Sequence, residues 1–283
     1  MTNQWENFLN NLGEWHGSFT NISPKGEIVN DTPSTLLLEG LEDNKKARLT
    51  LRRFTPNPHN PEEPEVNELV REYQSLGRDM LFFENGAFSQ GSIQIAPYSV
   101  SGAEFGFINN NRRLRVVELF NGDRSLDKLT LIREKRAGTD AVESPPLTVD
   151  ALLGVWQGEA TTIYPDWRSP EKYPTKMQLK IDNSGNLTQA TTWGETNPKT
   201  IVSTARIEGS ILHFDAGSLP VKLFLLPGGA SAVVPVKIEL RKSLFFEAGW
   251  LIEPGYRQRL IRSYNDKGEW VSLTLVEERL INN

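Results

Sequence analysis

One pattern, Gly-x-Trp-x-Gly, occurs twice in this chain of 283 residues, at 13–17 and again at 154–158, a spacing of 141 residues. A second pair of segments, 113–135 and 257–279, aligns without a gap at a shift of 144. This alignment matches Arg113, Arg115 and Glu134 with Arg257, Arg259 and Glu278. A nearly constant shift at both ends of each half indicates duplication of a whole domain. We therefore expect two domains of one fold, residues 1–137 and 148–283, joined by a linker near 138–147 that contains glycine, serine and two prolines.

Each half is predicted to begin with a short helix and to continue as a series of short strands. Trp5, Phe8, Leu9 and Leu12 recur at the spacing of one helix face, and Thr148 can cap a second helix. Runs such as "ARLTLRRF" and "KMQLKID" then alternate in polarity, and turn sequences such as "SPKG" and "DNSGN" separate them. Many short strands are typical of a β-barrel or a sandwich. We expect an all-β protein of two tandem antiparallel β-barrels, because the helix ahead of each can plug one open end.

Composition excludes several classes of protein. The chain has no cysteine, which rules out disulfides, thiolate metal sites and cysteine catalysis. A net charge of -5 gives no electrostatic reason to bind nucleic acid or an anionic membrane surface. The first residues lack the pattern of a secretory signal, and no apolar run has the length of a membrane span. We expect a soluble, cytoplasmic protein.

No residue pattern predicts catalysis or a metal centre. The three histidines, His16, His59 and His213, lie far apart and form no metal-binding pair, so each is more typical of an exposed or half-buried side chain. The chain has no nucleophile elbow, and Gly228-Gly229 follows a proline, which predicts a turn rather than a phosphate loop. We therefore expect a binding protein rather than an enzyme.

Each half is expected to contain a helix, then Gly-x-Trp on the first strand, and then an arginine on a late strand. This order resembles the signature of the lipocalin, or calycin, superfamily. The resemblance implies that Gly13 and Trp15 close the floor of one barrel and that Gly154 and Trp156 close the other. Glycine there allows close approach of backbones, and a late arginine stacks on each tryptophan. The candidates for this arginine are Arg115 or Arg133 in the first half and Arg259 or Arg279 in the second.

Residues 106–135 are also similar to the closing part of the S-type phycobiliprotein lyases. Those lipocalin-fold proteins carry an aromatic residue, an Asn-Asn or Pro-Asn turn and an Arg-x-Arg strand. Phe107, Asn109, Asn110, Arg113 and Arg115 occupy comparable places here. The layout of two such halves resembles an uncharacterised cyanobacterial family of calycin fold. The lyase resemblance implies a bilin as candidate cofactor and a phycobiliprotein subunit as candidate partner.

The candidate ligand site is the interior of a barrel. Alternate residues of a strand share a face, so Arg113 and Arg115 point one way, as do Arg257 and Arg259. If that face is the lumen, the arginines can hold a ligand carboxylate. Aromatic residues are expected to line the lumen beside them: Phe107 and Trp250, together with Phe83, Phe88, Tyr98 and Phe246.

The predicted function is non-catalytic binding of a small amphipathic or hydrophobic ligand, either a bilin or a fatty acid. One alternative is a lyase-like chaperone that hands a bilin to a protein partner. Another is a structural or interaction module, because side chains alone can fill a small barrel. An open lumen would favour the first two, and an exposed apolar surface patch would favour the third.

Overall fold

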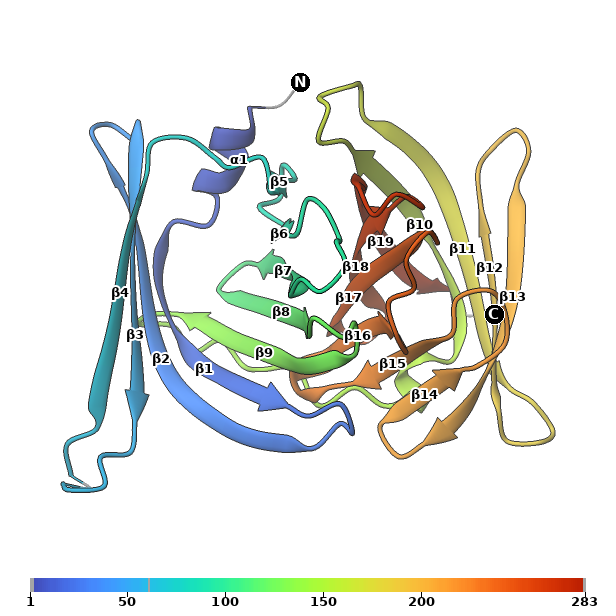
Figure 1. Cartoon of the computed structure of the whole chain (residues 1–283), viewed down its shortest axis with the longest axis horizontal. Coiled ribbons are helices and arrows are strands. Elements are labelled where there is room, and N and C mark those ends of the chain that lie inside the picture. Colours follow the sequence, from blue (N-terminus) through green and yellow to red (C-terminus); the bar gives the residue numbers. More distant parts are fainter. Residues whose placement is uncertain (1–2, 61, 282–283) are drawn as a thin grey trace.

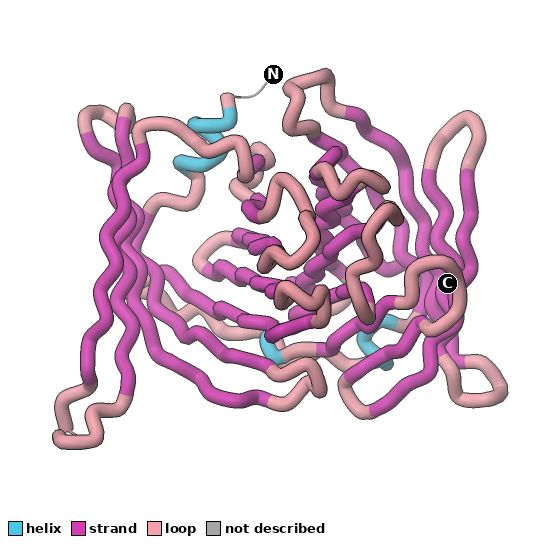
Figure 2. Tube along the Cα trace, in the orientation of Figure 1, coloured by secondary structure: helices cyan, strands magenta, loops and turns pink. Residues whose placement is uncertain are grey.

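A computed structural model describes residues 3–60 and 62–281 and consists almost wholly of β-strands in two units (Figures 1 and 2). The N-terminal unit contains α1 (Gln4–Leu9), β1 (Gly13–Ile22), β2 (Ile28–Leu41), β3 (Lys46–Thr55), β4 (Glu65–Tyr73), β5 (Met80–Phe82), β6 (Phe88–Gly91), β7 (Ser101–Asn109), β8 (Arg112–Phe120) and β9 (Leu126–Arg136). The C-terminal unit contains α2 (Val149–Leu152), β10 (Gly154–Ile163), β11 (Glu171–Ile181), β12 (Leu187–Trp193), β13 (Lys199–Glu208), β14 (Ile211–Phe214), β15 (Val221–Leu225), the 3₁₀ turn η1 (Pro227–Gly229), β16 (Ala230–Pro235), β17 (Leu244–Glu253), β18 (Tyr256–Tyr264) and β19 (Trp270–Ile281). The predicted all-β class with two barrel-like units and short leading helices is confirmed.

The two units share one strand order but differ in closure. In the C-terminal unit β10 to β19 pair in sequence, and β10 also pairs with β19 to close the barrel. The N-terminal sheet runs β4-β3-β2-β1-β9-β8-β7-β6-β5, with β4 and β5 as its two edges. The difference is β14, which lies between β13 and β15 and has no counterpart between β4 and β5. The N-terminal barrel is therefore open on the side between these two edges (Figure 1).

The Gly-x-Trp-x-Gly pattern lies on the first strand of each unit and allows it to pack closely against the last. A Cβ atom on Gly17 would collide with the carbonyl oxygen of Arg133 on β9, and one on Gly158 would collide with that of Glu277 on β19. Only glycine lets these backbones approach so closely. Gly13 and Gly154 also have positive φ values of 136° and 118°, which side chains disfavour.

The two units pack back to back through their central strands. β7 and β8 of the N-terminal unit contact β16 and β17, and β6 and β7 contact β18. Phe120 stacks on Phe246 with 5.0 Å between ring centroids, and Phe107 lies 6.3 Å from Trp250. Both faces of β7 and β8 are consequently buried, whereas β4 is exposed along almost its whole length.

The contacts between the units are reciprocal. The backbone N–H of Ile95 donates to the carbonyl of Gly268 (2.8 Å), and the N–H of Ile238 donates to the carbonyl of Arg124 (3.0 Å). These two pairs occupy equivalent positions of the two repeats. Phe107 and Trp250 are equivalent positions too and contact each other, which places them near an approximate two-fold axis. The duplicated chain is therefore arranged like an isologous dimer in one polypeptide.

Candidate functional site

A buried tryptophan on the first strand lies inside each unit. Trp15 and Trp156 are fully buried, and their indole N–H groups donate to the carbonyls of Asn11 (3.1 Å) and Leu152 (2.8 Å), each four residues earlier. The guanidinium of Arg113 lies 4.6 Å from the Trp15 ring centroid, and that of Arg257 lies 4.4 Å from the Trp156 ring centroid. Arg136, which is paired directly opposite Trp15, adds a second cation at 4.5 Å.

The prediction of which arginine stacks on each tryptophan is wrong in both halves. Arg113 and Arg257 do so, rather than Arg115 or Arg133 and Arg259 or Arg279. Arg115 and Arg259 lie on the same face but two residues further from the tryptophan. Arg133 is paired with Ser18, whose face of β1 is opposite to that of Gly17 and Trp15, and it binds Glu143. Arg279 lies 4.5 Å from the ring of Tyr256.

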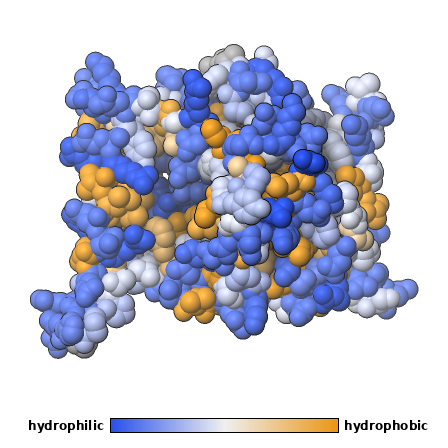
Figure 3. All heavy atoms as spheres, in the orientation of Figure 1, coloured by the Kyte–Doolittle hydropathy of each residue, from blue (hydrophilic) through white to orange (hydrophobic). Residues whose placement is uncertain are grey.

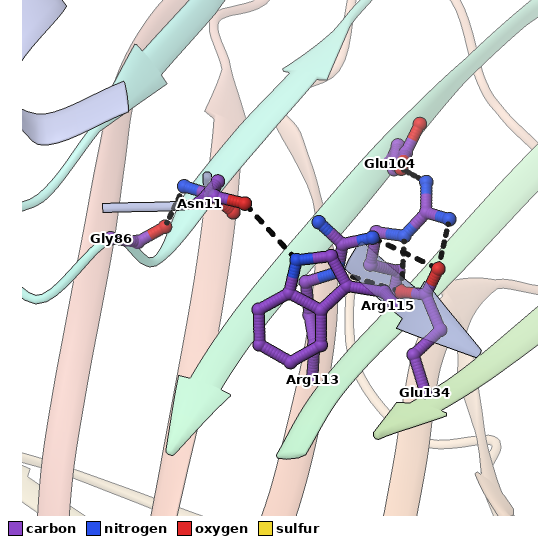
Figure 4. A network of polar contacts seen from close by, with 7 residues as sticks. Asn11, Gly86, Glu104, Arg113, Arg115 and Glu134 are labelled. Carbon is purple, nitrogen blue, oxygen red and sulfur yellow. Dashed lines mark hydrogen bonds and ion pairs between the residues drawn. The ribbon is translucent and has the colours of Figure 1, made fainter. Parts of the chain in front are cut away.

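The inward-facing arginines of the N-terminal unit bind carboxylates of the chain itself, in what we call the floor network (Arg113, Arg115, Glu104 and Glu134; Figure 4). Arg113 donates to both oxygens of Glu134, at 2.7 and 2.9 Å. Arg115 donates to Glu134 at 3.1 Å through two nitrogens and to Glu104 on β7 at 2.8 Å. Two positive and two negative charges balance within the network.

The C-terminal unit repeats this arrangement. Arg257 donates to Glu278 at 2.6 Å, and Arg259 bridges Glu278 (3.0 Å) and Glu247 (3.0 Å). Burial alone would raise the pKa values of Glu134 and Glu278. The adjacent arginine charges outweigh that effect and hold both pKa values at about 2. The sequence alignment pairs Glu134 with Glu278, but it does not show that these two glutamates are the partners of the arginines.

The shared face of Arg113 and Arg115, predicted from strand alternation, is the inner face of the N-terminal sheet. Their guanidinium groups are already occupied by carboxylates, so a ligand carboxylate would have to share or displace these bonds. Arg257 and Arg259 are in the same situation. Whether any of the four binds a ligand stays a prediction.

The aromatic residues expected in the lumen are distributed over three places. Phe88 lies on the inner face of the N-terminal sheet. Phe107, Phe246 and Trp250 do not line a lumen, because they pack between the two units. Tyr98 is 94% exposed on the β6–β7 loop, and Phe83 belongs to the core that the units share. Trp250 also borders a separate cleft at the junction of the units.

A pocket of about 90 Å³ lies on the inner face of the N-terminal sheet, between its two edges, and we call it the concave pocket. Its wall is mostly apolar and comes from α1, β2, β3, β5 and β6: Phe8, Leu36, Leu38, Leu49, Met80, Phe82 and Phe88. Its polar end is formed by Gln90, Glu104, Arg113 and Arg115, so it joins the floor network directly.

The histidines do not come together. His16 contacts Glu14 at 2.7 Å, His213 lies 3.4 Å from Glu208, and His59 is exposed in the loop between β3 and β4. Among residues 3–60 and 62–281, no group of three side chains is arranged to hold a metal ion. In the same ranges, no helix is long and apolar enough to cross a membrane.

The fold and these sites define a tandem protein of two related β-barrel units, one closed and one open. The chain belongs to the DUF3598 family. It is 51% identical to a crystallised protein of unknown function from that family in Nostoc punctiforme, with a TM-score of 0.91 over 99% of this chain and 100% of that one. A family model for the N-terminal domain of DUF3598, a domain of unknown function, matches residues 1–139.

Residues 143–281 match a different family model, described as the C-terminal domain of biogenesis factor required for ATP synthase 1. An S-type phycobiliprotein lyase from Guillardia theta is 10% identical, with a TM-score of 0.40 over 48% of this chain and 91% of that one. No curated protein matches the sequence.

Proposed function

We propose that this protein acts by binding rather than by catalysis, and that its N-terminal unit holds a small amphipathic ligand, a fatty acid or a bilin, in the concave pocket. The observation that carries the proposal is the open side of the N-terminal sheet, where a mostly apolar wall ends at the polar floor network. Apolar walls with a few convergent polar groups are typical of small-molecule sites. The pocket of about 90 Å³ would hold one part of such a ligand, and the rest would extend past the open side of the sheet.

The proposal favours the N-terminal unit because the C-terminal barrel is closed by β14. The side chains of Leu212 and Phe214 on that strand belong to the apolar core of the C-terminal barrel. The N-terminal unit has no strand at this position, and Leu49 and Met80 remain partly exposed there. One ligand per chain is the expected stoichiometry.

A titration with biliverdin and, separately, with a C16 fatty acid tests this proposal by absorbance and native mass spectrometry. Met80→Trp should fill the mouth of the concave pocket and weaken binding at least about tenfold. Val70→Trp is the matched control, because Val70 is 51% exposed on the outer face of β4. Equal binding by both variants, or no binding of either ligand by the unmodified protein, would refute the proposal.

The polar end of the pocket gives a second arm to this experiment. If Arg115 shares its charge with a ligand carboxylate, the acid should bind at least about tenfold more tightly than its methyl ester, because a charge-assisted bond is lost. Equal affinity for acid and ester would show that Arg115 is not part of the ligand site.

A bilin that binds would also support the chaperone alternative, in which a phycobiliprotein subunit accepts the bilin. Mixing the bilin-loaded protein with that subunit would test transfer.

A second candidate function is assembly of a protein complex, in line with the interaction-module alternative. The match of residues 143–281 to an ATP synthase biogenesis factor supports it, as does the free edge of β4. Within the described residues β4 pairs with β3 alone, and Val66, Leu69 and Val70 are 54, 36 and 51% exposed. Such an edge can pair with an extended segment of a partner. Figure 3 shows apolar side chains gathered over this side of the molecule, at the left.

Pull-down of purified ATP synthase subunits tests this candidate. Leu69→Lys with Val70→Lys should abolish capture, because two added lysines oppose strand pairing at an edge. Val29→Lys on β2 is the control, since Val29 is 65% exposed away from that edge. Capture that survives the double substitution would exclude the β4 edge as the docking strand.

A further inference from the structure

A cleft of about 380 Å³ lies where the outer face of β1, β8 and β9 meets the linker and the C-terminal unit, and we call it the junction cleft. It is distinct from the concave pocket, because its basic side chains lie on the outer face of the strands, although Arg113 and Glu134 of the floor network also border it. Arg112 and Lys135 face the cleft, whereas Arg113 and Glu134 direct their charged groups to the inner face. Its volume falls in the range of small-molecule sites.

Four basic side chains form the floor of the junction cleft. Arg112 on β8 is paired across the sheet with Lys135 on β9, and Lys135 is paired with His16 on β1. Arg133 lies two residues before Lys135 on the same face of β9. Like charges directly opposite each other on a sheet are destabilising unless another charge compensates them.

The protein compensates only part of this charge. Arg133 is neutralised by Glu143 (2.7 Å) and Asp31 (3.7 Å), although its buried Nε has no hydrogen-bond partner in the described structure. Arg112 donates to two neutral acceptors, Ser144 Oγ (2.7 Å) and the carbonyl of Ile252 (2.9 Å). Burial also lowers the pKa of Arg112. Lys135 forms no ion pair with any described residue and is exposed.

The second repeat provides an internal comparison. The floor network is the same in both halves, as expected for residues on which the barrel itself depends. The basic set is kept at one position only: Lys135 aligns with Arg279, whereas Arg112, Arg133 and His16 are replaced in the second half by Tyr256, Glu277 and Gln157. Because the two units have related folds, the charges of Arg112, Arg133 and His16 are not required to build a unit of this kind.

We propose that the junction cleft binds a small organic anion, with its carboxylate or phosphate group held by Lys135 and Arg112 and its less polar part beside Trp250. Arg112 lies 5.2 Å from the Trp250 ring centroid and bonds both the linker and β17, so the anion would bind where the two units and the linker meet. Sites at such junctions are common for small ligands. This site is separate from the one in the proposed function.

Isothermal titration calorimetry of the full chain with inorganic phosphate, ATP and succinate tests the proposal and distinguishes the two anion classes. At least one probe should bind, and raising the salt concentration should weaken it. Lys135→Gln should reduce affinity at least about tenfold, while Lys128→Gln, an exposed lysine on the same strand, should not. Met80→Trp should leave anion binding unchanged, which separates this site from the concave pocket.

Arg112→Gln should weaken binding as strongly, but it can also loosen the contact between linker and β17. Lys135→Gln is therefore the decisive variant, since Lys135 is exposed and makes no ion pair in the described structure. Absence of heat with all three probes at millimolar concentration would overturn the proposal. So would binding that Lys135→Gln and Lys128→Gln reduce equally.

Discussion

Arg113 combines two roles in one side chain, as both the cation over Trp15 and the bidentate partner of Glu134. Arg113→Leu should destabilise the protein by about 3–5 kcal/mol, because Glu134 would stay buried with half of its partners removed. Urea unfolding at pH 7 measures this. Arg48→Leu, which breaks an exposed ion pair with Glu72, is the control and should cost much less. Similar losses for both variants would contradict a stabilising role for the network.

The same networks predict how stability responds to acid. The pKa values of Glu134 and Glu278 are about 2 in the folded protein, below the ordinary value of 4.5. Their contribution is therefore complete above about pH 4.5 and is lost as the pH falls towards 2. Each carboxylate contributes on the order of 3 kcal/mol over that window. Urea midpoints measured from pH 6 to pH 2.5 should fall steeply below 4.5, and Glu134→Gln should flatten the fall.

At the scale of single residues, strand alternation predicts which side chains share a face, but it does not predict which partners come from other strands. It predicted that Arg113 and Arg115 share a face, because that follows from strand geometry alone. It could not identify the carboxylates, since Glu104 and Glu134 come from two neighbouring strands whose register the sequence does not show. Recurrence of Glu134 as Glu278 was the available signal, because a buried arginine pair requires acidic partners.

At the scale of elements, the first strand of each unit depends on one close approach. Gly17→Ala should destabilise the N-terminal unit by about 1–3 kcal/mol, because the new methyl group meets the Arg133 carbonyl and must separate β1 from β9. Ser18→Ala on the same strand is the control. Hydrogen exchange should show faster exchange along β1 and β9 in Gly17→Ala only. Unchanged protection there would mean that the strands tolerate the methyl group.

The open side of the N-terminal barrel also belongs to this scale. The duplication predicts two tandem barrels of one fold, yet the segment between β4 and β5 is too short to contain a counterpart of β14. Comparing residues 74–79 with 209–220 would have indicated a missing strand.

The inward and outward faces of the strands could not be assigned from the sequence in the same way. β7 and β8 are buried on both faces, so the alternation of polarity that distinguishes lumen from exterior is absent from them, and Phe107 was assigned to the wrong side.

At the scale of the whole molecule, the two units share one apolar core. Phe246 is fully buried against Phe120 and Tyr264, which belong to different units. Phe246→Ala should cost about 3–5 kcal/mol and lower the stability of both units together. Trp fluorescence and hydrogen exchange should then shift in parallel during urea unfolding. Two separate transitions in the unmodified protein would contradict a single cooperative core.

Glu118 lies in the same interface and gives it a pH dependence of opposite sign. Its side chain is fully buried on β8, and neither carboxylate oxygen has a hydrogen-bond partner among the described residues. Burial, with a smaller contribution from Glu247, raises the pKa of Glu118 well above its ordinary value. The folded protein then retains this proton to higher pH than the unfolded chain does. Stability is consequently lost as the pH rises above about 4.5, until the folded pKa is passed.

Glu118→Gln removes that titration and keeps the shape of the side chain. The variant should therefore gain stability over the unmodified protein as the pH rises from 5 to 8, and Glu65→Gln, an exposed substitution on β4, should not. Urea unfolding at several pH values provides the comparison. A constant difference between Glu118→Gln and the unmodified protein across that range would show that Glu118 ionises in the folded state at its ordinary pKa. The carboxylate would then have found water or a cation within the interface between the two units.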